Sequence, residues 1–238
     1  MNVDVAELGT LLGVWAHPDD EAYLAAGLMA AAVDAKQHVA CVTATLGDAG
    51  QTADPVRWPT QELPDIRRAE LGRALEVLGV TDHECLDLPD GGLADFDPHA
   101  PVARIADVVE RVRPDTVITF GPDGMTGHPD HQTVSTWATA ALELAGHHAT
   151  VLWATKTEAW VQAFADLVDA VFPAGLPPRT SAAQAWELVL DDDALARKLR
   201  ALEAHASQTS GLVDAVGRDR YAESVRHEAF RQASAPAT

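Results

Sequence analysis

The chain has 238 residues, 47% of them hydrophobic, which is enough to bury the core of one large α/β domain. Its 36 Asp and Glu against 17 Lys and Arg give a formal net charge of −19, and such a surface repels phosphate backbones and anionic lipid. The composition therefore argues against nucleic acid and membrane partners.

The N-terminal segment has neither a basic n-region nor a long apolar h-region, and no apolar run reaches the roughly 18–20 residues of a membrane span. The two cysteines, Cys41 and Cys85, stand apart in apolar, strand-like contexts. We therefore expect reduced cysteines and a cytoplasmic protein.

Short β-like runs alternate with longer helical runs over the first 155 residues. In chain order, we predict strand Thr10–Trp15, helix Glu21–Lys36, strand His38–Ala44, helix Pro64–Leu78, strand Glu84–Leu88, helix Val102–Val112, strand Asp115–Phe120, helix Pro129–Leu144 and strand Thr150–Ala154. This alternation is typical of βαβ units. The sequence therefore predicts a Rossmann-like α/β fold with a mostly parallel sheet flanked by helices.

The pattern is less regular in the last third of the chain. The sequence predicts helices at Trp160–Val171 and Asp193–Ser207, a strand at Ala185–Leu190, a loop at Pro173–Pro178 and a frayed A-S-A-P-A-T tail. We expect one domain over residues 1–238, with a regular α/β core at 1–155 and a less regular C-terminal part at 156–238. The loop Gly47–Trp58, rich in Gly, Asp, Thr and Pro, is long enough to be a binding loop.

The segment V-W-A-H-P-D-D-E, Val14–Glu21, places one imidazole and three carboxylates after the first predicted strand. In open parallel sheets, ligands bind outside the carboxyl ends of the strands. His17 and Asp20 are three positions apart, so a helical turn beginning here directs both side chains the same way. Alone, the segment is equally typical of a helix N-terminus, where acidic side chains interact favourably with the helix dipole.

A second segment, G-P-D-G-M-T-G-H-P-D-H-Q, follows the strand that ends at Phe120 and repeats the design in His128-Pro129-Asp130-His131. Helix capping does not explain two such corners after separate strands. We therefore predict one joint metal site at the carboxyl edge of the sheet.

The residue types of the two corners indicate the chemistry. His17, Asp20 and His131 form a two-His, one-carboxylate set that leaves a position open for water, as in a catalytic zinc site, and the same set also suits non-haem Fe(II). Asp19 is a further carboxylate, placed to take a proton from a metal-activated water. The remaining pair comprises His128, placed to donate to an oxyanion, and Asp130, placed to orient His128. A base and an oxyanion donor favour metal-assisted hydrolysis.

The paired motifs A-H-P-D-D-E (Ala16–Glu21) and G-H-P-D-H (Gly127–His131) resemble those of the PIG-L/LmbE-like zinc-dependent de-N-acetylases, which remove acetyl or a related acyl group from N-acylated amino sugars. The resemblance covers most of the chain. Further segments similar to family motifs are T-L-G-D-A-G (Thr45–Gly50, with Asp48 in place of the usual Glu), R-R-A-E-L with L-G-V (Arg67–Leu71 and Leu78–Val80), L-P-D-G-G-L (Leu88–Leu93) and K-L-R-A-L-E-A-H-A-S-Q (Lys198–Gln208).

The resemblance implies one Zn²⁺ per chain on His17, Asp20 and His131. It also implies Asp19 as the general base and a substrate carbonyl polarised by the His128–Asp130 pair.

Two weaker correspondences concern the substrate. Arg67 matches an arginine that lies near the substrate in the family, and Asp90 matches an acidic substrate contact. Arg67 can instead pair with Glu70 or a neighbouring acid, and Asp90 can instead form a turn before Gly91-Gly92. Glu21 is expected to be a structural partner at the helix start.

The resemblance implies an amide hydrolase, an N-deacetylase, acting on a small-molecule N-acyl amino sugar or glycoconjugate, with Fe²⁺ or another divalent ion as the alternative to Zn²⁺. Two other functions stay open: a non-haem Fe(II) oxygenase, in which Asp19 and His128 have no evident role, and a non-catalytic sugar-binding module, which needs neither residue. The chain lacks long insertions, which argues against the mycothiol-pathway enzymes. The sequence leaves open homo-oligomerisation and the choice among thiol precursors, thiol conjugates, antibiotic glycosides and chitooligosaccharides.

Overall fold

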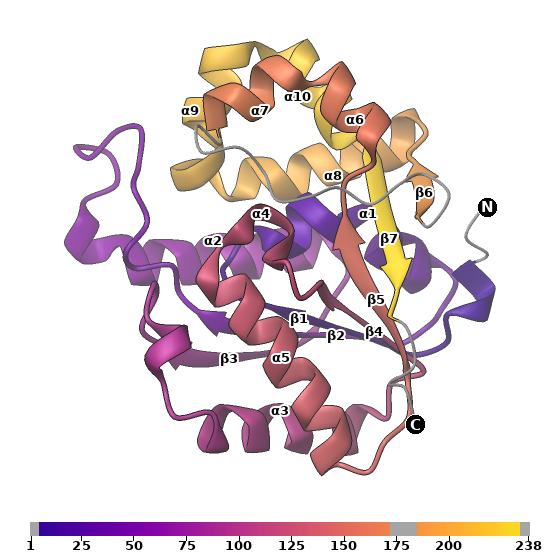
Figure 1. Cartoon of the computed structure of the whole chain (residues 1–238). Helices are drawn as coiled ribbons and strands as arrows, with labels where there is room; N and C mark the ends of the chain where they lie inside the picture. The colour runs from indigo at the N-terminus through magenta and orange to yellow at the C-terminus, as the bar shows by residue number, and fades with distance from the viewer. Residues whose placement is uncertain (1–4, 172–184, 234–238) are drawn as a thin grey trace.

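The structure, a computed structural model, describes residues 5–171 and 185–233, with side chains described to residue 168 in the first range (Figure 1). Its described part contains a seven-stranded sheet in the order β3-β2-β1-β4-β5-β7-β6. The strands are β1 (Leu11–Trp15), β2 (Val39–Thr45), β3 (Asp82–Leu88), β4 (Thr116–Phe120), β5 (Thr150–Thr155), β6 (Trp186–Val189) and β7 (His227–Gln232). Strands β1 to β5 pair in parallel, whereas β7 is antiparallel to β5 and β6. The predicted Rossmann-like, mostly parallel α/β fold is confirmed.

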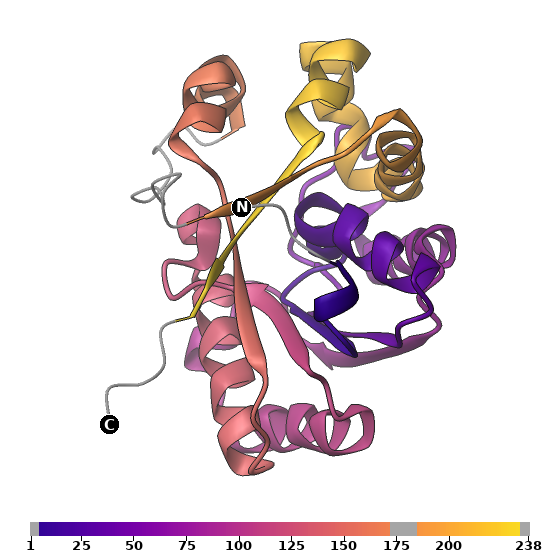
Figure 2. The same cartoon turned by 90° about the vertical axis from the view of Figure 1, so that its right-hand side faces the viewer.

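Helices cover both faces of this sheet (Figures 1 and 2). On one side, α1 (Asp20–Asp34), α2 (Leu63–Leu78) and α8 (Asp192–Ala204) pack together, and on the other α3 (His99–Val112) packs against α5 (Pro129–Leu144). The apolar face of α3 explains its position, because Ile105, Val108, Val109 and Val112 recur at helical spacing and are all buried.

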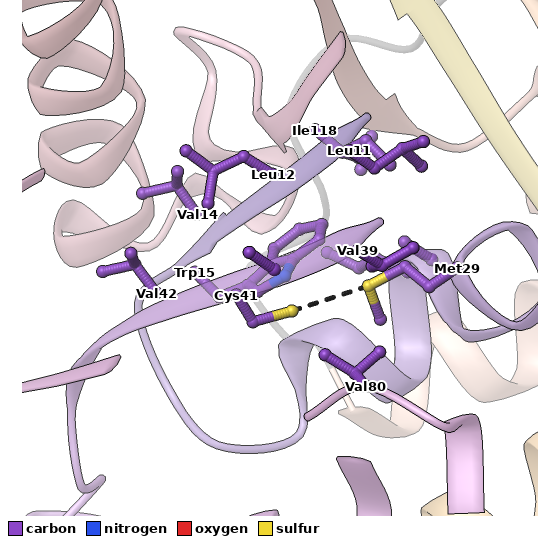
Figure 3. Close-up of a cluster of buried hydrophobic side chains, with 14 of the residues drawn as sticks. Leu11, Leu12, Val14, Trp15, Met29, Val39, Cys41, Val42, Val80 and Ile118 are labelled. Carbon is purple, nitrogen blue, oxygen red and sulfur yellow. Dashed lines mark hydrogen bonds between the residues drawn. The ribbon is translucent and has the colours of Figure 1, made fainter. Parts of the chain in front are cut away.

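The core lies between the sheet and these helices. All five residues of β1 are buried because the strand is flanked by β2 and β4 and covered by helices on both faces. Figure 3 shows Trp15, Met29 and Cys41 in one cluster, with the Cys41 thiol 3.6 Å from the Met29 sulfur. Cys41 and Cys85 are both free thiols, as the sequence predicts.

Every element predicted before residue 155 is present. The helix predicted at Pro129–Leu144 has those bounds, and α2 ends at Gly79, whose φ of 80° is the left-handed conformation that glycine tolerates. The largest difference is in α3, which begins at His99 rather than Val102.

The last third differs more from the prediction. The single helix predicted at Trp160–Val171 is two helices, α6 (Glu158–Ala163) and α7 (Ala165–Val171), broken at Phe164. The helix predicted to reach Ser207 ends at Ala204, and α9 (Ala206–Val216) follows after a break at His205. The strand predicted at Ala185–Leu190 is β6. The loop at Pro173–Pro178 and all but the first residue of the A-S-A-P-A-T tail lie outside the described residues.

Three elements near the C-terminus were not predicted, α9, α10 (Arg218–Val225) and β7. The sequence hides β7 because its buried Glu228 is paired: the carboxylate accepts hydrogen bonds from Gly27 and Leu28 N–H and lies 2.7 Å from the buried Lys198 ammonium. These bonds fix the C-terminal strand to α1. The short elements are α4 (Gly124–Gly127) and the 3₁₀ turns Val5–Glu7, Thr60–Glu62 and Leu93–Asp95.

The C-terminal helices form a layer of their own. In Figure 1, α6, α7, α9 and α10 gather at the top of the molecule, beyond the parallel sheet. None of the described helices is both long and apolar enough to cross a bilayer. The division into a core at 1–155 and a C-terminal part at 156–238 stays a prediction.

Candidate metal centre and active site

The two His-Pro corners meet where the strand order reverses. β1 and β4 are neighbours in the sheet but are separated in the chain by β2 and β3. Such a switch point leaves a crevice at the carboxyl ends of the strands, where open α/β sheets bind ligands. His17 lies in the turn after β1, and His131 lies in the first turn of α5, which follows β4 through α4. The fold thus brings together residues 114 positions apart.

Three polar side chains converge at this point, and all are buried: His17, Asp20 and His131. His131 Nε2 is 3.2 Å from His17 Nδ1 and 3.4 Å from Asp20 Oδ1, and Asp20 Oδ2 is 3.6 Å from His17 Nδ1. These donor atoms are close enough to share one metal ion. A second set, His17, His128 and Asp130, also meets this distance criterion, so the location of an ion is open to test.

Hydrogen bonds on the far side of each ring indicate which nitrogen faces the cluster with a lone pair. His131 Nδ1 is 2.9 Å from the carbonyl oxygen of Gly124, which can only accept, so Nδ1 carries the hydrogen. His17 Nε2 lies 2.9 Å from Asp90 Oδ1 and 3.4 Å from Asp130 Oδ2. When both rings are neutral, the lone pairs of His17 Nδ1 and His131 Nε2 therefore point toward each other beside the Asp20 carboxylate. This donor set fits a cation, with outer partners that fix each imidazole as in known metal sites.

The carboxylates around His17 favour positive charge at the cluster, which a second hydrogen on His17 supplies when no metal ion is bound. Burial lowers the pKa of His17, but hydrogen bonds to Asp130, Asp20 and Asp90 outweigh it and hold that pKa well above the ordinary histidine value. Burial lowers the pKa of His131. The surroundings of His17 thus favour a positive charge at the cluster.

Asp19 has an unusual backbone conformation. Its φ of 106° lies in the left-handed region, which costs a non-glycine residue on the order of 1–3 kcal/mol. The conformation is held because Asp19 N–H donates to Glu21 Oε2 at 3.0 Å and its carbonyl accepts from Tyr23 N–H at 2.9 Å. Burial raises the pKa of the Asp19 carboxyl to about 6, with Arg67 acting against that rise. Asp19 therefore has a strained backbone, and its carboxylate lies next to the metal-binding cluster without belonging to it.

Glu21 is a structural partner at the helix start, as expected. Its other carboxylate oxygen is 2.7 Å from His205 Nε2, and both side chains are completely buried. His205 lies at the break between α8 and α9, so this pair connects the C-terminal layer to the backbone of Asp19. The sequence reasoning left His205 out of the site. Its place in the H-x-S-Q motif was the available signal.

The hydrogen bonds of Asp130 differ from the expected pairing of its carboxylate with His128, and its role in orienting His128 stays a prediction. Asp130 contacts His128 only through its backbone, whose N–H donates to His128 Nδ1 at 3.1 Å. Its carboxylate instead accepts from Gly91 and Leu93 N–H, at 2.8 and 3.1 Å, and approaches His17. The loop after β3 therefore turns Asp130 toward the other corner. Because His128 Nδ1 accepts a hydrogen bond, the neutral ring carries its hydrogen on Nε2.

Arg67 is buried beside Asp19. It donates to the carbonyl oxygens of Gly47, at 3.1 Å, and Pro18, and its guanidinium is 3.5 Å from Asp19 Oδ2. It does not pair with Glu70, which accepts two hydrogen bonds from Ser207.

Asp90 lies directly on the cluster. One carboxylate oxygen contacts His17, and the other accepts from Ala49 N–H at 3.0 Å. The structure therefore places both predicted substrate residues close to the cluster, but contact of either with a substrate stays a prediction.

A cavity of about 310 Å³ opens beside the cluster, and Asp20 and His131 form part of its wall. Its other described lining residues are mostly apolar or aromatic: Tyr23, Leu24, Met125, Thr126, Lys156, Trp160, Leu167, Val168, Gln208, Leu212, Tyr221, Ser224 and Val225. The sequence analysis did not predict this cavity, because its walls come from helices that approach one another only in the folded chain.

Fold and site together define a Rossmann-like α/β protein with a candidate metal centre at the switch point of its sheet. The sequence model of a family described as "PIG-L: GlcNAc-PI de-N-acetylase" matches residues 12–142, and the chain belongs to this family. The predicted relationship to the PIG-L/LmbE-like de-N-acetylases is confirmed.

A relative in Actinosynnema mirum, named 1D-myo-inositol 2-acetamido-2-deoxy-alpha-D-glucopyranoside deacetylase, is 33% identical over 89% of this chain and 85% of its own length. The chain spans about half the length of other relatives with the same name, 50% and 53% in two cases. These names agree with the expected N-deacetylase class. Whether the compact length separates this chain from such enzymes stays untested.

Solved structures share the fold across nearly the whole chain. N,N'-diacetylchitobiose deacetylase from Pyrococcus horikoshii superimposes with a TM-score of 0.67 at 17% identity, covering 96% of this chain and 85% of that one. A 4-carboxy-2-hydroxymuconate hydratase from Pseudomonas putida gives 0.67 at 19% identity, covering 97% and 98%. At these identities the likeness establishes the fold alone, and the reaction must be argued from the site.

Proposed function

We propose that this protein is a zinc-dependent hydrolase that removes an acyl group from the nitrogen of an N-acylated amino sugar or glycoconjugate. The observation that carries the proposal is the convergence of two imidazole lone pairs and the Asp20 carboxylate, with the free carboxylate of Asp19 beside them. Nitrogen and oxygen ligands without a thiolate suit Zn²⁺, and three protein ligands leave room for water. Fe²⁺ or another divalent ion is the alternative on the same ligands.

In this proposal, His17, Asp20 and His131 hold the metal ion. Bound there, the ion supplies Lewis acidity and activates a water for attack on the amide carbonyl. Asp19 accepts the proton of the attacking water, and Arg67 holds the Asp19 carboxylate in place from 3.5 Å. His128 donates its Nε2–H to the carbonyl oxygen as negative charge develops there.

Asp19 then passes its proton to the leaving nitrogen. The C–N bond breaks, and the products are a carboxylate and a free amine. The backbone strain of Asp19, with φ of 106°, supports this role, because strained residues are concentrated at active sites.

The first substrate to test is an N-acetylglucosaminyl-inositol, since the relatives described above are named for deacetylating one. The experiment incubates the zinc-loaded full chain with a panel of N-acyl amino sugars and detects released carboxylate and free amine. The proposal expects equal amounts of both products, formed about 10²- to 10⁴-fold more slowly by an Asp19→Asn control at the same metal content. Oxygen uptake coupled to turnover in a parallel Fe²⁺-loaded sample would instead identify an Fe(II) oxygenase. Sugar binding without any product would identify a binding module.

A further inference from the structure

The cavity beside the cluster differs in polarity from the rest of the site. Around Asp19, the surroundings are charged, with Arg67 and Asp90 close by. Next to Asp20 and His131, the 310 Å³ cavity is instead lined chiefly by aliphatic and aromatic side chains of α1, α7, α9 and α10.

This difference separates the two groups attached to an amide. A sugar ring carries several hydroxyls, and burying them without hydrogen-bond partners is unfavourable. The charged groups near Asp19 can satisfy those hydroxyls, whereas the exposed wall of the cavity is mostly carbon. Its polar side-chain groups outside the cluster include those of Thr126, Lys156, Gln208 and Ser224 and the hydroxyls of Tyr23 and Tyr221, which hydrogen-bond to each other. Because Asp20 and His131 belong to the cavity wall, the group that fills it lies next to the reacting carbonyl. Of the two groups on that carbonyl, the sugar on the nitrogen carries the hydroxyls and the other carries none. That group is the acyl chain.

We propose that the cavity is an acyl-binding pocket and that the preferred substrate carries an apolar N-acyl chain several carbons longer than acetyl. The inference rests on the proposed hydrolase function and names its substrate class. The reaction adds water across the amide C–N bond, giving the fatty carboxylate and the free amino sugar. The cavity is roughly ten times the ~30 Å³ that one water molecule occupies in the liquid, so an acetyl methyl would leave most of it unfilled.

Lys156 is the cationic residue among the described lining residues. Its ammonium lies 4.5 Å from the centre of the Trp160 ring and donates to the His227 carbonyl oxygen at 3.4 Å. Burial, together with neighbouring Lys198, lowers the pKa of Lys156 to about 7. A wall of this kind is compatible with an uncharged chain that ends in a methyl group.

The test compares glucosamine carrying N-acetyl, N-butanoyl, N-hexanoyl and N-octanoyl groups on the metal-loaded chain. We expect kcat/KM to rise about fourfold per added methylene until the cavity is full. A flat or falling series with N-acetylglucosamine still hydrolysed would overturn the acyl pocket and leave the proposed function intact. Hydrolysis of none of these substrates would count against the proposed function. In that case the acyl-pocket proposal is tested by titrating octanoate into the protein and measuring its binding. Absence of saturable binding would overturn the acyl-pocket proposal as well.

A matched pair of variants locates the effect. Leu212→Trp narrows the cavity, whereas Leu144→Trp makes the same change at a residue 62% exposed near the end of α5. The octanoyl-to-acetyl ratio of kcat/KM should fall at least about 10-fold in the first variant, from the loss of two or more buried methylenes, and stay unchanged in the second. Val168→Phe, which narrows the cavity from α7, replaces Leu212→Trp if that variant unfolds. Equal ratios in a folded cavity variant and Leu144→Trp would contradict the assignment.

Two further substrates test whether a preference for N-octanoyl substrates has a cause other than an apolar acyl pocket. An N-acetylglucosamine with an octyl aglycone tests whether the cavity takes the other end of the substrate, and a gain for it that Leu212→Trp abolishes would overturn the acyl assignment. An acyl chain of equal length ending in a carboxylate tests Lys156. A preference for that chain over N-octanoyl would contradict an apolar pocket.

Discussion

The two His-Pro corners share the letters H-P-D but differ in where the following helix begins. After β1, α1 begins at Asp20, three residues past His17, and Asp19 is the N-cap. After β4, α5 begins at Pro129, and His128 is itself the N-cap. His17 can therefore turn its ring into the cluster, whereas the His128 ring accepts from the Asp130 N–H, and His131 reaches the cluster one turn later. The same residue types thus take different roles because the backbone register differs.

Strain and support are unequal as well. The first corner contains the strained residue, Asp19 with φ of 106°, whereas the N-cap of the second has an ordinary φ of −64°. A residue of the second corner helps to position a side chain of the first, because the Asp130 carboxylate lies 3.4 Å from His17 Nε2. Each corner is therefore incomplete without the other.

The largest expected effect comes from Asp20→Ala, which removes the carboxylate that links the two corners. Metal and activity should be lost together, because two buried imidazoles would remain without their charged partner. Elemental analysis and the deacylation assay measure both, with Asp34→Ala at the far end of α1 as control. Full metal occupancy in Asp20→Ala would remove Asp20 from the ligand set.

Asp19→Asn tests the role assigned to the strained position. The variant should keep its metal and lose about 10²- to 10⁴-fold in turnover, the range typical of a general acid-base group. Asparagine is also tolerated at positive φ, so the fold should persist. Near-normal turnover in the metal-replete variant would leave the reaction without its base.

His128→Ala tests the corresponding group of the second corner. Turnover should fall about 10²- to 10³-fold with the metal retained, as for other single oxyanion donors. Unchanged turnover would make His128 only a helix cap. Loss of metal instead would indicate that His128 is a ligand.

Asp130→Asn sharpens the comparison, because the sequence and the structure assign this carboxylate to different histidines. If it braces His17, metal affinity should weaken by about 10- to 100-fold, as for other outer partners of ligand histidines. Competition with a chelator measures this, and Asp90→Asn should behave similarly. Unchanged affinity with a turnover defect like that of His128→Ala would restore the sequence-based pairing.

The smallest effect concerns the Glu21–His205 pair behind Asp19. Burial lowers the pKa of His205, but Glu21 outweighs it, with Asp19 and Glu70 also nearby, so the folded pKa is raised. The stabilisation is therefore complete below the ordinary histidine pKa of about 6.5 and is lost as pH rises through the raised value. Urea unfolding across this range should show a decline in the free energy of unfolding that is weaker in His205→Gln. The same pH dependence of the free energy of unfolding in the wild type and in His205→Gln would contradict this role of the Glu21–His205 pair.

Local patterns predicted the fold of the first 155 residues and the identity of the clustered side chains. Buried strands and helices with one apolar face have a strong period, and the two corners are readable because each lies directly after a strand. The sequence could not predict that Asp130 faces His17, since this depends on where the loop after β3 places the N–H groups of Gly91 and Leu93. It missed β7 because Glu228 looks exposed until its partner Lys198 is known. Contacts between distant segments decide both cases.

Anomalous scattering from a crystal of the zinc-loaded protein would place the ion among the two candidate donor sets. We expect one peak per chain between His17 Nδ1, His131 Nε2 and the Asp20 carboxylate, at about 2.0–2.2 Å from each. A peak bound by His128 and Asp130 together with His17 would contradict this, because the second corner would then supply its ligands through the residues assigned here to the oxyanion and to the support of His17.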